Sequence, residues 1–293
     1  MNFTDFYLRA KVGLPQVVSS VVSLLKVLVL TRKASHYPPK IASECVVLGN
    51  GPSLQESLNQ HFDFLKKSEL FCVNNFALST YYVQLQPRNY LLLDPFFFAH
   101  ELEKLPNAEA VKSLKAMQAN TTWPLNLFIP TIGRNAPVVQ FLGQNPNITF
   151  VYFNYIVAKG LDGLLFWLFK NQLAMPQCQN VLAAATFLAV NQRFEKVYLV
   201  GADQSWHEDI HLSEDGQRVL MRHVYFYNNA QTAQISQYGT SPEMYVSLAT
   251  QFSNFSKIFR TYELLERYAK YVGVKVLNAS TKSYIDAFER VRL

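Results

Sequence analysis

The residues with the clearest capacity for chemistry form the loop Gly49-Asn50-Gly51-Pro52-Ser53. It follows an apolar run at residues 45–48, which is typical of a buried strand. Two glycines permit a tight turn and close approach of backbone to a ligand, and Ser53 is placed to cap a following helix, whose free N–H groups favour an anion. The loop is neither G-x-G-x-x-G nor a P-loop with its lysine. The loop therefore predicts a nucleotide-type ligand, but it indicates neither NAD binding nor ATP hydrolysis. An ordinary strand-to-helix turn is the alternative.

Two more polar residues follow apolar runs and are expected at the same edge of a sheet. Asn74 follows the run at 70–73, and its amide both donates and accepts hydrogen bonds, which suits a base edge or a sugar hydroxyl. Asp94 follows the run at 90–93 and can hold a hydroxyl or a metal ion. Each residue is also of a type common in turns.

A third group of polar residues lies at 203–209, directly after the apolar run at 197–200. His207 is a candidate general base or phosphate ligand, with Asp203 or Glu208 to orient it. Its spacing from His211 is that of a zinc-binding pair, but the segment is predicted to be a loop and no H-E-x-x-H order is present. We therefore expect no metal site.

A second histidine, His223, is followed by Tyr225 and Tyr227. Phenolic hydroxyls can donate hydrogen bonds to a departing phosphate without a metal. An amphipathic edge strand is the alternative interpretation. Near the C-terminus, Asn278 and Ser280 are expected to form a polar turn facing the same crevice, before a short helix.

Alternating strands and helices favour an α/β fold, a Rossmann-like and mainly parallel sheet. The polar segment 204–240 interrupts the alternation and is predicted to be a lid-like insertion in a domain spanning 41–293. Strands are predicted at 45–48, 70–73, 90–93, 127–129, 149–152, 197–200 and 275–277, and the clearest helices at 161–173, 181–192 and 242–271, the last capped by Ser241-Pro242.

The N-terminal region, 1–35, contains an apolar stretch at 14–30 with basic residues on both sides and Lys26 within it. A bilayer span needs about 20 apolar residues, so the stretch is short. An amphipathic helix at the membrane interface, a helix packed on the domain or on another subunit, and a true anchor are the three possibilities. We favour peripheral contact with the inner face of the cell membrane, in the cytoplasm, and a homo-oligomer is compatible with the second possibility.

Composition narrows the class of protein. Hydrophobic residues make up 49% and charged residues 16%, which disfavours a multispanning protein. The net charge of +6 comes from dispersed basic residues, so it suits an anionic substrate or membrane surface rather than nucleic acid. The three cysteines, Cys45, Cys72 and Cys178, lack C-x-x-C spacing and are expected to be reduced core residues.

With these motifs, the sequence resembles bacterial glycosyltransferases of the sialyltransferase-like group (glycosyltransferase family 42) and the related motility-associated transferases that modify flagellin. The resemblance covers roughly residues 45–290. Its markers are the Gly49–Ser53 loop, Asn74 and the segments 194–203 and 278–290.

The resemblance implies a metal-independent, inverting transfer from a CMP-activated acidic sugar, on a GT-A-like Rossmann variant, to a glycan or lipid-linked glycan of the cell surface. No cofactor is expected. Asn50 and Asn74 match the asparagines that contact the nucleotide. Candidates for the phosphate-binding residues are Tyr225 and Tyr227, and candidates for the base are His207 and His223.

The sequence departs from the family in two places. The predicted helix at 242–271 has no histidine at its start, where the family's base lies, and a Thr-Ser-Gly turn near the donor is replaced by Asn180-Val181-Leu182. The identity of the catalytic base therefore stays open. The donor is expected to carry a sialic-acid-like nonulosonic acid or another sugar. A pterin pyrophosphokinase-like enzyme, with Mg²⁺ on Asp94 and Asp203, and a non-catalytic sugar-nucleotide-binding protein are the alternatives.

Overall fold

The computed structural model describes residues 3–99, 108–217, 219–227, 234–237 and 247–293. Its centre is an eight-stranded sheet, in the order β11-β10-β6-β1-β2-β3-β4-β5, in which all neighbouring strands are parallel. The predicted Rossmann-like α/β fold is confirmed. The strands are β1 (Glu44–Leu48), β2 (Glu69–Val73), β3 (Asn89–Leu91), β4 (Leu125–Pro130), β5 (Ile148–Phe153), β6 (Lys196–Val200), β10 (Lys275–Asn278) and β11 (Glu289–Arg290).

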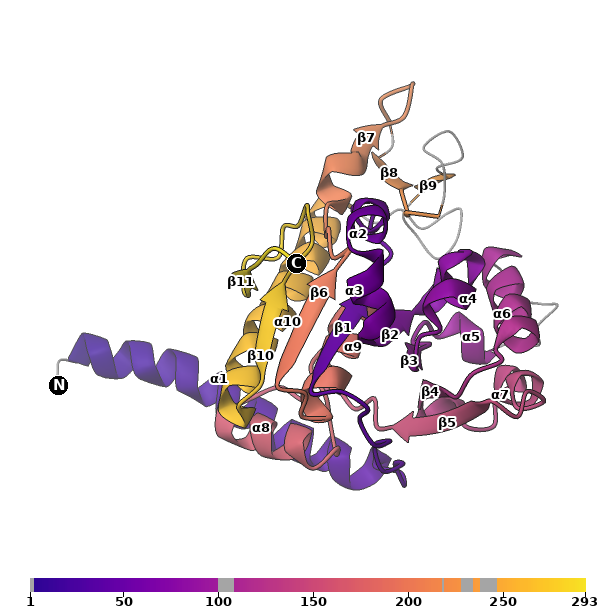
Figure 1. Cartoon of the computed structure of the whole chain (residues 1–293). Helices are drawn as coiled ribbons and strands as arrows, with labels where there is room; N and C mark the ends of the chain where they lie inside the picture. The colour runs from indigo at the N-terminus through magenta and orange to yellow at the C-terminus, as the bar shows by residue number, and fades with distance from the viewer. Residues whose placement is uncertain (1–2, 100–107, 218, 228–233, 238–246) are drawn as a thin grey trace.

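Helices cover both faces of this sheet (Figure 1). The strands are apolar on both faces: in β1, Cys45 and Val47 belong to one core, and Val46 and Leu48 to the other. Such continuous apolar runs are expected where both faces are buried. The first core contains α8 (Asp162–Lys170), α9 (Val181–Asn191) and α10 (Leu248–Val272), and the second contains α2 (Leu54–Gln60), α3 (Phe62–Lys67), α4 (Tyr81–Leu85), α5 (Phe96–Ala99), α6 (Ala108–Asn120) and α7 (Pro137–Leu142).

A small antiparallel sheet rises from the end of β6 (Figure 1). It follows the 3-10 helix η4 (Trp206–Asp209) and consists of β7 (Ile210–Leu212), β8 (Val219–His223) and β9 (Gln234–Gln237). The sequence predicted a polar insertion at 204–240, with an amphipathic edge strand at residues 222–227 as an alternative. β8 ends at His223, so Tyr225 and Tyr227 lie beyond it. Two further 3-10 helices are η1 (Asn74–Leu78) and η3 (Thr131–Gly133).

The direction in which the chain adds strands to the sheet reverses between β1 and β6. From β1 the chain moves through β2, β3, β4 and β5 to one edge, and it then returns to β6 on the other side of β1. In open α/β sheets the crevice beyond the carboxyl ends at such a switch point is where ligands bind. The Gly49–Ser53 loop lies at this point.

Three local predictions are wrong. The helix expected after Asn278 is absent from the described residues 279–293, which form an extended tail ending in β11. The helix predicted from residue 242 begins at Leu248, where Ser247 accepts the Thr250 N–H at 3.2 Å; the predicted cap at 241–242 lies outside the described residues. Ser53 precedes α2 without a capping hydrogen bond from its side chain.

The N-terminal apolar stretch forms part of α1 (Phe3–Leu30), a helix that extends beyond the body of the domain (Figure 1). Residues Gly13–Leu30 are long and apolar enough to cross a membrane by length and composition alone. Val27 is buried and belongs to the same core as α8, α9 and α10.

Candidate functional site

A cavity of about 410 Å³ lies beyond the carboxyl ends of β1, β2, β3 and β6. This volume is within the range of small-molecule sites. Most of the residues predicted from the sequence line it together: Gly49, Asn50, Gly51, Pro52, Asn74, Asp94, Asn180, Asp203, Tyr225 and Tyr227. Ser53 and His207 do not belong to its lining.

The glycines of the Gly49–Ser53 loop are required by its packing on the loop after β6. A Cβ at Gly49 would lie 2.3 Å from the carbonyl oxygen of Gly201. At Gly51 it would lie 2.1 Å from the Asp203 carboxylate. We expected the two glycines to let the backbone approach a ligand closely. In the structure they let it approach the loop after β6. Gly201 adopts φ +68°, in the left-handed region that favours glycine.

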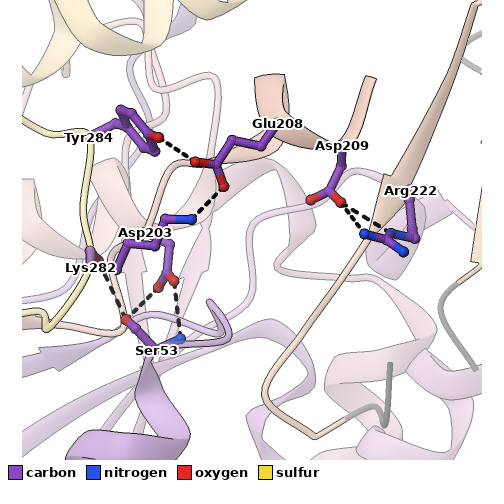
Figure 2. A network of polar contacts seen from close by, with 7 residues as sticks. All are labelled: Ser53, Asp203, Glu208, Asp209, Arg222, Lys282 and Tyr284. Carbon is purple, nitrogen blue, oxygen red and sulfur yellow. Dashed lines mark hydrogen bonds and ion pairs between the residues drawn. The ribbon is translucent and has the colours of Figure 1, made fainter. Parts of the chain in front are cut away.

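Asp203 holds this loop in place (Figure 2). Its carboxylate accepts the Ser53 backbone N–H at 3.0 Å and the Ser53 hydroxyl at 2.7 Å. Burial raises the pKa of Asp203, and the hydrogen bonds from Ser53 partly oppose that shift. The Ser53 side chain, predicted to cap α2, is used for this contact instead. Asp203 is therefore a positioning residue for the Gly49–Ser53 loop.

Three asparagines that line the cavity have buried side-chain oxygens with no hydrogen-bond partner: Asn50, Asn74 and Asn75. Each of these side chains has another contact: Asn50 Nδ2 donates to the Val73 carbonyl at 3.1 Å and Asn74 Nδ2 to Asp94 at 2.5 Å. The Asn75 side chain is hydrogen-bonded to the Tyr227 hydroxyl. Buried acceptors are rarely left unpaired. These oxygens are suited to a ligand that donates several hydrogen bonds.

The backbone of Asn74 is strained to place its side chain. It adopts φ +45°, in the left-handed region, and its carbonyl accepts the Tyr90 hydroxyl at 2.5 Å. Asp94, which orients its amide, is largely buried, and that burial raises the pKa of the Asp94 carboxyl. A strained backbone conformation persists only where neighbouring contacts hold the residue in it, and this is often the case at functional sites.

Tyr225 and Tyr227 form one wall of the cavity. Their rings are stacked, with centroids 5.3 Å apart and an interplanar angle of 10°. The Phe226 N–H between them donates to the Asn50 carbonyl at 3.2 Å, and the Phe226 ring packs on Phe76. Burial raises the pKa of both phenols, so both keep their protons at neutral pH. They can act as hydrogen-bond donors.

The N-terminus of α9 meets the cavity on another side. Asn180 caps this helix by accepting the Ala183 N–H at 2.8 Å, while its amide nitrogen contacts Gln204 and Tyr262. Val181 and Leu182, in the first turn, also line the cavity. The free N–H groups and dipole of a helix N-terminus favour an anionic group.

An apolar compartment completes the cavity, and of its residues the sequence marked only Trp206, in the polar segment 203–209. Trp206 stacks on Phe255 of α10, with ring centroids 6.1 Å apart, and Met221 and Ile258 lie in the same lining. Gln251 is buried here, and its side-chain oxygen lacks a hydrogen-bond partner. No local motif marks the residues contributed by α10 and β8, because these two elements come together only in the folded chain.

The remaining polar candidates whose side chains are described lie outside the cavity lining. His207 is exposed and packs edge-on against Tyr284, while Glu208 binds Lys282 at 2.5 Å and also contacts the Tyr284 hydroxyl (Figure 2). Asn278 and Ser280 are buried in hydrogen bonds to the tail and to the loop after β6, not facing the crevice as expected. The side chain of His223 lies outside the described residues.

Among the described residues, no group of three or more His, Cys, Asp and Glu side chains could hold a metal ion. The three cysteines are buried free thiols. Asp94 and Asp203, the two carboxylates that a pterin pyrophosphokinase-like site would need for Mg²⁺, are bound by Asn74 and Ser53 respectively.

Comparison with known proteins gives a match among solved structures. No family model matches the sequence, and no curated protein does. Among solved structures, the chain is similar to a MAf glycosyltransferase from Magnetospirillum magneticum AMB-1, with a TM-score of 0.50 and 11% sequence identity. The match covers 94% of this chain but only 38% of that protein. It supports a glycosyltransferase-like fold; membership of family 42 stays a prediction.

Proposed function

We propose that this protein is a glycosyltransferase that binds a nucleotide-activated sugar in the cavity and transfers the sugar to a glycan acceptor. The observation that carries the proposal is the set of unpaired oxygens of Asn50, Asn74 and Asn75 at the sheet's switch point, in one cavity with the N-terminus of α9. The fold similarity to a MAf glycosyltransferase supports the same reaction class.

The nucleoside occupies the asparagine side of the cavity. Exocyclic amino groups and ribose hydroxyls donate hydrogen bonds, which is the chemistry that unpaired amide oxygens require. Cytosine, adenine and guanine each supply such an amino group, and uracil supplies only its ring N–H. The choice of a CMP-type donor among them rests on the family resemblance. Asp94 orients Asn74 through the 2.5 Å hydrogen bond.

The phosphate lies between the Tyr225–Tyr227 pair and α9. Transfer breaks the bond between the anomeric carbon and the phosphate oxygen, leaving negative charge on the nucleotide. Two protonated phenols and the free N–H groups of α9 can stabilise this charge as it develops, which accounts for a transfer without a metal ion.

The sugar and the acceptor occupy the compartment of Trp206, Met221 and Phe255. An acceptor hydroxyl attacks the anomeric carbon in line with the departing phosphate, and its proton passes to a base. Because His207 lies outside the lining, we assign the base to His223, which lies in sequence between the lining residues Met221 and Val224.

Thermal-shift measurements with CMP, UDP, GDP and ADP, each with and without EDTA, test the donor class. We expect CMP to raise the melting temperature by ~2–5 °C with EDTA present. Asn50→Ala should abolish the shift, and Asn120→Ala, at an exposed asparagine of α6, should preserve it. Binding only of another nucleotide, or only with Mg²⁺, would reject the CMP-type donor; a Mg²⁺-dependent pyrophosphate transfer to a pterin would reject the glycosyltransferase.

Turnover requires its own assay, because a nucleotide-binding protein without activity would pass the first one. Release of CMP from a CMP-activated nonulosonic acid should depend on an added glycan acceptor. His223→Ala should retain the thermal shift with CMP and lose CMP release. Equal release by wild type and His223→Ala would contradict the assignment of the base.

A further inference from the structure

Helix α1 buries a narrow, mostly polar face and exposes most of its apolar side chains, the reverse of an ordinary surface helix. Ser20, Ser23 and Val27 are the side chains buried in its described part, at 7%, 3% and 7% exposure. The exposed large hydrophobic residues are Leu14, Val17, Val18, Val21, Val22, Leu24, Leu25, Leu28, Val29 and Leu30, with Leu28 and Val29 at 80% and 81%.

The polar face is bonded to the domain at the turn before α8. The Ser23 hydroxyl donates to the Lys159 carbonyl at 2.7 Å and accepts the Lys159 N–H at 2.8 Å. The Ser20 hydroxyl accepts the Leu161 N–H at 3.0 Å. A Cβ at Gly160 would lie 2.2 Å from this hydroxyl, so glycine at 160, with φ +137°, permits the contact.

The C-terminal end of α1 is fixed as well. The side chain of Asn154 accepts the Arg32 N–H at 3.1 Å and donates to the Arg32 carbonyl at 3.0 Å. The helix is thus held to the domain over its C-terminal half. To span a bilayer, Gly13–Leu30 would have to break these bonds or carry the 159–161 turn into the hydrocarbon, where unpaired backbone groups are costly.

The charge around the apolar face indicates what covers it. Lys26, Arg32 and Lys33 are exposed, as is Lys159 in the turn that holds the helix, and residues 13–33 contain no acidic side chain. Trp167, on α8 directly after that turn, is 53% exposed. Apolar residues flanked by basic ones, with an exposed tryptophan, are typical of helices that lie in the interface of an anionic bilayer.

We propose that α1 lies parallel to an anionic lipid surface, inserting its apolar face while Ser20 and Ser23 hold the domain above it. Lys26, Arg32, Lys33 and Lys159 contact lipid phosphates, and Trp167 lies at the level of the headgroups. The proposal does not depend on the glycosyltransferase activity.

Flotation of the full-length protein with vesicles tests the proposal. We expect binding to vesicles of equal parts phosphatidylglycerol and phosphatidylcholine, weaker binding to phosphatidylcholine alone, and a blue shift of tryptophan fluorescence that Trp167→Phe reduces. Leu28→Glu should lower the bound fraction at least ~10-fold. Leu212→Glu, at a residue 63% exposed on β7 at the opposite end of the molecule, is the matched control (Figure 1).

Three outcomes would overturn the proposal. Binding of Leu28→Glu equal to wild type, with both proteins folded by their thermal transitions, would show that the apolar face does not meet lipid. A lipid-free dimer in light scattering that Leu28→Glu dissociates would assign the face to a second copy of the chain. Resistance of vesicle-bound protein to extraction at alkaline pH would indicate a spanning helix.

Discussion

The two halves of the cavity are built in different ways. On the sheet side, Gly49, Gly51 and Asp203 lock two loops together through contacts that leave no room for a Cβ. On the other side, the segment bearing Tyr225 and Tyr227 is joined to the sheet side by the hydrogen bond from Phe226 to Asn50. The first half is fixed by the fold, and the second is carried on an insertion. Substitutions should therefore affect stability on the sheet side and turnover on the other.

The largest effect is expected at Gly51. In Gly51→Val the Cβ would collide with the Asp203 carboxylate and with the Gly201 carbonyl oxygen, which lies 2.7 Å from its position. We expect a loss of about 3–5 kcal/mol in the free energy of unfolding, measured in urea, because backbone must move. Gly163→Ala, where nothing lies within 4 Å of the added carbon, should be neutral or slightly stabilising. Equal stability of the two variants would show that the loops are not locked.

Asp203→Ala should come next. It leaves the Ser53 N–H and hydroxyl without their acceptor, so we expect about 1–3 kcal/mol of destabilisation and weaker CMP binding. Asp203→Asn should recover part of the stability, since one oxygen can still accept a hydrogen bond. An unchanged thermal transition in Asp203→Ala would assign the carboxylate to substrate rather than to the loop.

On the insertion side, Tyr227→Phe should act on turnover. Removing the phenolic hydroxyl is expected to lower kcat by ~10–100-fold with little change in the melting temperature or in CMP binding. Tyr284→Phe, which removes an exposed hydroxyl that contacts Glu208 outside the cavity lining, is the matched control. A rise in KM without a change in kcat would place Tyr227 in ground-state binding instead.

A smaller effect concerns pH. The pKa of Asp94 is raised by burial, so the folded state holds this proton to a higher pH than the unfolded state does. The free energy of unfolding of the wild type should fall as the pH rises from the ordinary pKa of aspartate to the raised pKa of Asp94. Above that pH the loss should stay constant. In Asp94→Asn that fall should vanish, while Asp63→Asn, at an exposed site, should parallel wild type. If the dependence of stability on pH were the same in Asp94→Asn and in wild type, the raised pKa of Asp94 would be contradicted.

The smallest effect is expected at His207. Because this side chain packs on Tyr284 outside the cavity lining, His207→Ala should change kcat/KM by less than ~3-fold, whereas His223→Ala should lower it at least ~100-fold. The reverse order would return the role of base to His207.

The sequence predicted the sheet well, because each parallel strand is a short apolar run buried on both faces. It also predicted which strand ends gather polar residues, since Asn50, Asn74, Asp94 and Asp203 all follow such runs. What these residues do locally was less predictable. Ser53 has the chemistry of a helix cap, but a buried carboxylate 150 positions away in the chain competes for its hydroxyl.

The apolar compartment of the cavity was not predictable in the same way. The stacking of Trp206 on Phe255 and the burial of Gln251 depend on where α10 packs, and the three-stranded sheet consists of strands of three to five residues. The pattern at 278–290 was misleading, because its polar residues bind backbone groups of the β6 loop instead of starting a helix.

The hydrogen bond from the Phe226 N–H to the Asn50 carbonyl has a kinetic consequence. It joins the segment carrying both tyrosines to the loop on which the nucleoside is proposed to rest, so we expect this junction to cover a bound nucleotide. The donor should then enter before the acceptor, and the spent nucleotide should leave after the glycosylated product. In steady-state terms, we expect an ordered sequential mechanism, with CMP inhibiting competitively against the donor and noncompetitively against the acceptor.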